Sequence, residues 1–142
     1  MSYSSDGSAR ERGPLSDPAS PSLHERQSLM VKCLGELFRY ASQQGYDLTL
    51  AEGFVQYERR TADGQLIRDG VHMVGSLHYV RLAQDINLFE KGQFITSASD
   101  PTWVDLGTFW MALDPLCRWG GTFTGKSAGD VGHFSIAWDG RA

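Results

Sequence analysis

Apolar residues recur every three or four positions between residues 26 and 43, and this spacing predicts an amphipathic helix. The pattern stops just before Gly45, and glycine commonly terminates helices. We expect the apolar stripe to pack against the core of the domain. Its members are Leu29, Met30, Cys33, Leu34, Leu37, Phe38 and Ala41.

A second helix is predicted to begin at Asp100 and Pro101. Asp is a favoured N-cap residue, and Pro is tolerated at the first helical position because its missing N–H has no partner there. The pair Asp114 and Pro115 is expected to end this helix. The side chains that we expect the helix to bury are Val104, Trp110 and Leu113.

Strand-like patterns complete the fold prediction. They occupy residues 48–54, 83–89 and 133–138. The middle segment alternates polar and apolar residues, which places Asp85 and Asn87 on one face and Ile86 and Leu88 on the other. The predicted class is therefore α+β, with a small antiparallel sheet flanked by helices.

Length and composition are those of one globular domain. A chain of 142 residues with 41% hydrophobic and 11% aromatic residues can bury a sizeable core. The net charge of −4 and the pI near 5.5 argue against nucleic acid as a partner, because phosphate binding favours a basic surface. No apolar run approaches the roughly 20 residues that a membrane span requires, so we expect no stable membrane insertion.

The amino-terminal segment differs in kind from the rest. Residues 1–21 are rich in Ser, Gly, Pro and charge and contain no apolar signal-peptide core. We expect a disordered tail without a signal peptide, followed by a single domain over residues 22–142. We also expect Cys33 and Cys117 to be a reduced, buried pair, with a disulfide bridge as the alternative.

Two distant fragments supply candidate metal ligands: His78 and Asp85 in the first, and His133 in the second. A catalytic zinc ion usually takes three protein ligands and keeps its fourth position for water. Seven residues of helix rise about 10.5 Å and seven of strand span about 23 Å, whereas metal bonds are about 2 Å long. The chain must therefore turn at residues 79–82. The plainer alternative is that the imidazoles are hydrogen-bonded packing groups.

Asp130 lies between Gly129 and Gly132, three residues before His133. A turn at this point can hold its carboxylate beside a metal-bound water without ligating the ion. Zinc lowers the pKa of its water from 15.7 to about 7, and a nearby carboxylate can then accept the proton. Asp130 is thus the candidate general base, and a turn cap between the two glycines is the alternative.

Four further residues lie near these fragments. Ser76 is expected to support the site through its hydroxyl or to cap the turn, because no activating base is paired with it. Tyr79 and Arg81, in the turn, are candidates for contacting a substrate carboxylate. Trp119 is a candidate for the wall of a cleft, although buried tryptophan is the commoner outcome.

The pattern Ser-x-His-x4-Ala-x-Asp at residues 76–85, with Asp-x-x-His-Phe at residues 130–134 after a Trp-Gly-Gly at 119–121, resembles the M15 zinc peptidases. That family includes D-Ala-D-Ala carboxypeptidases and dipeptidases and phage L-alanyl-D-glutamate endolysins. The likeness covers roughly residues 28 to 138 and is greatest to the phage-type branch. It implies a Hedgehog/DD-peptidase-like fold. It also implies His78, Asp85 and His133 as zinc ligands and Asp130 as the base.

Two positions depart from that family's pattern. Many members have Gly where this chain has Arg81, in a turn that favours a positive φ. Many also have an Arg directly after Glu-Gly-Tyr/Phe, thought to polarise the substrate or hold its carboxylate, where this chain has Val55. Arg59 or Arg60 is a candidate to replace that Arg from the next turn.

The resemblance implies a zinc-dependent peptidase that hydrolyses peptidoglycan stem peptides, with L-alanyl-D-glutamate endopeptidase activity favoured. The alternatives are a D-Ala-D-Ala carboxypeptidase and a non-catalytic, zinc-bearing component that binds the cell wall or belongs to a particle. We expect a monomer that is made in the cytoplasm. It would reach the wall after release, through a phage holin or as part of a particle.

Overall fold

The computed structural model describes residues 20–56, 58–60, 62–63, 66–68 and 76–142. Its helices are α1 (Leu23–Gln44) and α2 (Pro101–Leu113). Its strands are β1 (Asp47–Leu50), β2 (Glu58–Arg60), β3 (Leu66–Arg68), β4 (Ala83–Glu90), β5 (Gln93–Phe94), β6 (Cys117–Trp119) and β7 (His133–Ile136). Residues 1–19 of the predicted tail lie outside the described part of the chain.

Helix α1 starts three residues earlier than predicted and ends where expected. The Ser22 hydroxyl accepts a hydrogen bond from the Glu25 N–H, and the Glu25 carboxylate accepts one from the Ser22 N–H. This reciprocal capping box satisfies two N–H groups that have no partner inside the helix. Gly45 ends the helix with a φ of 77°, a conformation that costs glycine little.

Helix α2 confirms the predicted start at Asp100 but not the predicted buried face. The Asp100 carboxylate accepts a hydrogen bond from the Thr102 N–H, as an N-cap does. Val104 was expected to be buried, but 42% of it is exposed. The sequence of α2 is apolar on nearly every side, so periodicity alone does not single out the face that packs. The residues that the helix buries are Trp103, Leu106, Gly107 and Trp110.

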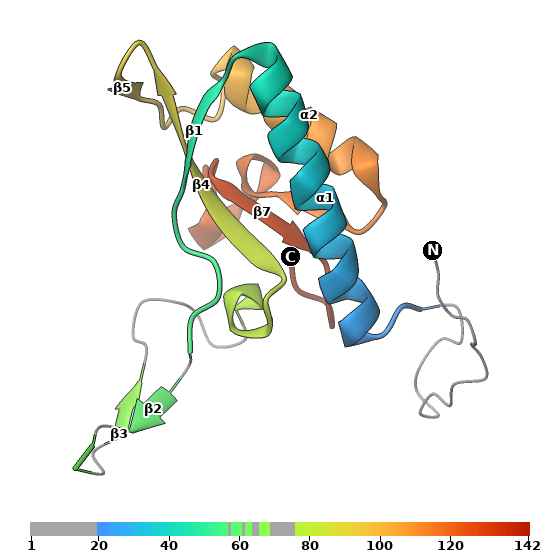
Figure 1. The fold of residues 1–142 in the computed structure, drawn as a ribbon, viewed down its shortest axis with the longest axis vertical. Coiled ribbons are helices and arrows are strands. Elements are labelled where there is room, and N and C mark those ends of the chain that lie inside the picture. Colours follow the sequence, from blue (N-terminus) through green and yellow to red (C-terminus); the bar gives the residue numbers. More distant parts are fainter. Residues whose placement is uncertain (1–19, 57, 61, 64–65, 69–75) are drawn as a thin grey trace.

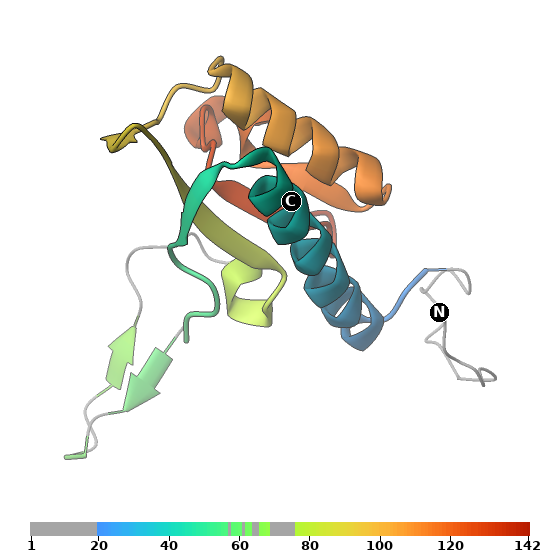
Figure 2. The same cartoon turned by 45° about the horizontal axis from the view of Figure 1, so that its top comes forward.

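The main sheet is antiparallel, and its strands lie in the order β1-β4-β7-β6, with β5 paired to β4. Strands β2 and β3 form a separate hairpin, which points away from the helices in both views (Figures 1 and 2). Both helices lie on the same side of the main sheet. The α+β class with a small antiparallel sheet and two helices is therefore confirmed.

Strand β1 is shorter than the predicted strand over residues 48–54. It ends at Leu50. The chain nevertheless continues alongside β4, because the Ala51 N–H donates to the Asp85 carbonyl and the Asp85 N–H donates to the Glu52 carbonyl. This extension brings residues 51–54 next to the part of β4 that carries Asp85.

The core fills the space between the helices and the sheet. The ring of Trp110 meets that of Phe134 edge to face, with centroids 5.6 Å apart. The Trp110 indole N–H is satisfied by the carbonyls of Arg118 and Ser135. Cys33 and Cys117 are both buried and free, with their sulfur atoms 3.8 Å apart, as predicted for a reduced pair.

Within the described residues, neither helix combines the length and the apolar character that crossing a bilayer would require.

Candidate metal centre

His78 lies in a short 3₁₀ helix, η1 (Leu77–Val80), which forms the turn predicted between the first two ligands. The Ser76 hydroxyl caps this turn by accepting a hydrogen bond of 3.2 Å from the His78 N–H. The predicted turn-cap role of Ser76 is thus confirmed. Arg81 ends η1 in the left-handed conformation, with φ 60° and ψ 33°, as expected for a position that favours glycine.

Asp85 and His133 face each other across two paired strands. Asp85 of β4 is directly opposite His133, the first residue of β7. Opposed residues in an antiparallel pair project from the same face of the sheet. Ile86 and Leu88 project from the other face and are buried in the core. The predicted alternation along β4 is therefore confirmed, with Asp85 on the face that turns away from the core.

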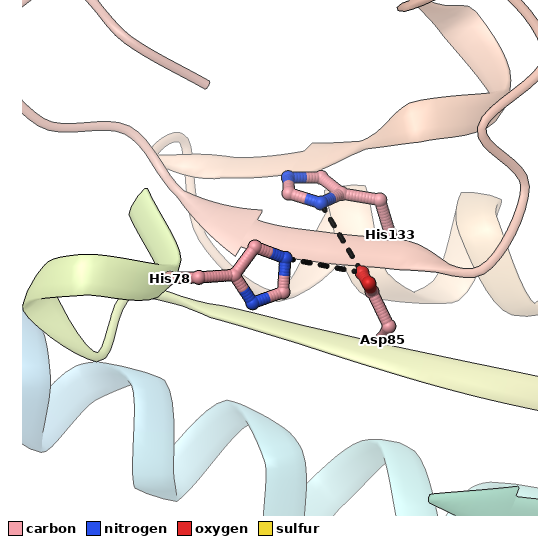
Figure 3. Close-up of side chains that lie close together, drawn as sticks. All are labelled: His78, Asp85 and His133. Atoms are coloured by element: carbon pink, nitrogen blue, oxygen red, sulfur yellow. Dashed lines mark ion pairs between the residues drawn. The ribbon is translucent and has the colours of Figure 1, made fainter. Parts of the chain in front are cut away.

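The three side chains converge (Figure 3). The Nε2 atom of His78 lies 3.3 Å from Oδ1 of Asp85, and the Nδ1 atom of His133 lies 3.4 Å from the same oxygen. One donor atom from each residue lies within 4.8 Å of the others. This cluster, which we call the His-Asp-His group, could hold a metal ion.

Hydrogen bonding within the group is incomplete, and this supports a cation between the three side chains. Oδ1 of Asp85 is buried and has no hydrogen-bond partner within the described residues. A buried carboxylate oxygen without a partner is costly. An ion placed among the three donors would satisfy that oxygen together with both imidazoles.

The backbone fixes which nitrogen of His78 faces the group. Its Nδ1–H donates a hydrogen bond of 2.7 Å to the Gly53 carbonyl. Nε2 then carries the lone pair, and it points toward Asp85. A ligand imidazole normally has its other nitrogen held in this way, which sets the tautomer and the ring orientation.

The pKa values of Asp85 and His78 are shifted in opposite directions by their proximity to each other. Burial alone would raise the pKa of Asp85, but the imidazoles of His133 and His78 beside its carboxylate outweigh burial and lower the pKa to about 2. For His78, burial lowers the pKa, while Asp85 and the Gly53 carbonyl raise it, with a net increase. Without metal, the group therefore attracts a proton to His78 at the place where a cation would bind.

Asp130 lies beside the group without joining it. Its Oδ2 is 3.9 Å from Nδ1 of His133, and 52% of its side chain is exposed. Burial raises its pKa, attraction to His133 partly offsets the increase, and repulsion from Asp85 adds to it. A carboxylate with a raised pKa next to a candidate metal group, and open to solvent, has the position that a general base requires.

The other predicted site residues have different surroundings. Trp119 is only 4% exposed, and its indole N–H donates to the Val131 carbonyl, so it is a core residue rather than a cleft wall. Tyr79 is half-buried in η1 and Arg81 is exposed directly after it. Arg59 lies in β2, and its side chain falls outside the described part of the structure.

Sequence reasoning missed the contacts that orient His78. Gly53 supplies them through its carbonyl, and Gln84 donates to the carbonyls of Ala51, Glu52 and Asp85. A Cβ atom at Gly53 would lie 2.7 Å from Oε1 of Gln84. Glycine within a predicted strand is a known sign of close approach, and that signal was present in the sequence.

Comparison with known proteins leaves the family open. No protein-family model matches this chain, and no curated protein matches it significantly.

Proposed function

We propose that this chain is a zinc-dependent peptidase that hydrolyses peptidoglycan stem peptides, with the L-alanyl-D-glutamate bond as the favoured target. The observation that carries the proposal is the convergence of His78, Asp85 and His133, with Asp130 beside them. The order and spacing of these residues resemble those of the M15 peptidases. A Hedgehog/DD-peptidase-like fold is part of the same proposal, and the small α+β architecture is compatible with it.

Zinc is the proposed ion because two imidazoles and one carboxylate are a frequent catalytic zinc set. Three protein ligands leave a position open for substrate or water. Mn, Co and Ni accept the same donor types and are the competing ions. The chemistry that such an ion supplies when bound is polarisation of a peptide carbonyl and acidification of water.

The protein's own groups account for the remaining steps. Asp130 accepts a proton from the attacking water and returns it to the amine that leaves. Its raised pKa makes it a better proton acceptor than an ordinary surface aspartate. A bound ion requires neutral imidazole ligands, and Asp85 supplies one negative charge, which offsets half of the charge of a divalent cation.

Two alternatives remain. A D-Ala-D-Ala carboxypeptidase would use the same groups on another bond. A non-catalytic, zinc-bearing protein that binds the wall or belongs to a particle is favoured by Val55, which stands where many M15 members have an Arg. In each case the proposed partner is the cell wall, reached after release from the cytoplasm, and the proposed state is a monomer.

A digest of purified peptidoglycan tests the proposal. The zinc-loaded protein should release new amino groups, and mass spectrometry of the fragments should identify the bond that is cut. Chelation of the metal and His78→Ala should each abolish the release. Binding to the wall without new amino groups would favour the non-catalytic alternative, and loss of a terminal D-alanine would favour the carboxypeptidase.

A further inference from the structure

Arg81 has an unusual backbone and an exposed side chain. Its φ of 60° belongs to the left-handed region, which costs a residue with a side chain about 1 kcal/mol or more. Glycine would avoid that cost, and strained positions of this kind concentrate at functional sites.

The side chain of Arg81 is held against an aromatic ring. Its Cζ atom lies 3.8 Å from the centroid of Phe54, which is itself 48% exposed. Stacking of this kind fixes the plane of a guanidinium and leaves its N–H groups pointing outward. Within the described residues, Arg81 has no side-chain hydrogen bond or ion pair, so no described group occupies these donors.

The same two chain segments hold both Arg81 and the ligand His78. The Arg81 guanidinium stacks on the ring of Phe54. Phe54 directly follows Gly53, and the Gly53 carbonyl accepts a hydrogen bond from the Nδ1–H of His78. The Arg81 N–H in turn donates to the His78 carbonyl. The guanidinium is therefore held by the two segments that also position His78, and it is not a freely moving surface charge.

We propose that Arg81 binds a carboxylate of the substrate, located on the Cα of the residue that supplies the nitrogen of the scissile bond. This inference rests on the proposed peptidase function and deepens it by naming what the site selects. Such a carboxylate occurs on γ-linked D-glutamate and also at a D-Ala-D-Ala terminus. A planar guanidinium matches it with two parallel hydrogen bonds. The protein should therefore discriminate against substrates in which this carboxylate is amidated.

The test uses two pairs of peptides, each pair identical except for a carboxylate or carboxamide at that Cα. One pair contains L-Ala-γ-D-Glu, and the other ends in D-Ala-D-Ala. The zinc-loaded wild type should prefer the acid over the amide by about tenfold or more in kcat/KM, as expected for a charge-assisted contact. The pair that shows the preference identifies the source of the carboxylate.

Substitutions at Arg81 test whether its guanidinium causes the preference for the acid over the amide. Arg81→Met should bring the acid-to-amide ratio near one, mainly by raising KM for the acid, and Arg81→Lys should retain part of it. Arg81→Gly relieves the backbone and should lose the preference in a fully folded protein. Lys91→Met is the matched control, because Lys91 is also exposed and left-handed, with a φ of 50°, but lies at the turn between β4 and β5. It should leave the ratio unchanged.

Binding measurements separate this inference from the proposed function. If no peptide is cleaved, calorimetry with the zinc-loaded protein should still show tighter binding of an acid than of its amide, and Arg81→Met should remove the difference. That outcome would reject hydrolysis and keep the carboxylate site. Equal or undetectable binding of acid and amide, or a preference that survives Arg81→Met, overturns the role of Arg81.

Discussion

The carbonyl oxygen of Gly53 lies 2.7 Å from Nδ1 of His78 and accepts a hydrogen bond from its N–H. This contact joins a backbone segment that follows β1 to the first candidate ligand, 25 residues later in the chain. It leaves Nε2 of His78 as the nitrogen that faces Asp85. Metal affinity should therefore depend on Gly53, although Gly53 does not belong to the His-Asp-His group.

Gly53→Ala is expected to weaken zinc binding about tenfold, the lower end of the range for groups that orient a ligand. The new Cβ would lie 2.7 Å from Oε1 of Gln84. The Gln84 side chain can shift only at the expense of its bonds to the carbonyls of Ala51, Glu52 and Asp85. Competition with a chromophoric chelator measures the affinity. An unchanged dissociation constant would show that the Gly53 contact does not tune the site.

Asp130→Asn should separate catalysis from metal binding. The amide cannot accept a proton from water, so kcat on a stem peptide should fall by at least about 100-fold. Because Asp130 is not a member of the group, zinc content measured by atomic absorption should remain at the wild-type level. Retained turnover in this variant would remove Asp130 from the mechanism.

The stabilisation that zinc provides should increase with pH. In the metal-free protein, His78 has a raised pKa. Its proton therefore contributes stability that is complete below about pH 6.5 and is lost as the pH rises through the higher folded pKa. Zinc requires the neutral imidazole and must displace this proton.

Thermal melts with and without zinc measure this effect. The increase in Tm caused by zinc should be small at about pH 5.5 and larger at about pH 8. Asp85, with a pKa of about 2, stays ionised over this whole range and does not contribute to the change. The same increase in Tm at both pH values would argue against His78 as a ligand.

Two glycines in helices should respond oppositely to the same substitution. A Cβ at Gly107 would lie 2.1 Å from the Trp119 ring, so Gly107→Ala should destabilise the protein by about 1–3 kcal/mol. Gly35 in α1 is exposed and has no atom within 4 Å of the added Cβ, so Gly35→Ala should stabilise it by about 0.5–1 kcal/mol. Urea unfolding measures both. Stability unchanged in Gly107→Ala would indicate that the indole can move away.

Strong local patterns predicted both helices and three of the strands, and ligand-type residues together with the M15 resemblance predicted the His-Asp-His group. The alternation of polar and apolar residues around Asp85 predicted which face of the strand carries its side chain. The distance between His78 and Asp85 required a turn after His78, and η1 forms that turn. The buried face of α2 was not predictable in the same way. Val104 and Trp103 are adjacent and both apolar, and tertiary contacts, such as those of Trp103 with Phe134 and the Ile95 carbonyl, distinguish the buried residue from the exposed one.

Contacts between residues far apart in the sequence could not be predicted from local patterns. Nothing local indicates that Trp119 would fill the space beside Gly107, or that the Gly53 carbonyl would reach His78. Both contacts depend on how separate segments meet in space. Glycine marks each of them, but its presence does not tell which side chain approaches.

The register that sets Asp85 opposite His133 also has a consequence for biosynthesis. The two residues are 48 positions apart, and β7 must pair with β4 before the third donor arrives. A nascent chain that has already formed η1 and β4 therefore has His78 and Asp85 in place but still lacks His133, the third residue of the His-Asp-His group. The proposed hydrolytic activity would therefore appear only after the segment that contains His133 has been translated and has packed against β4.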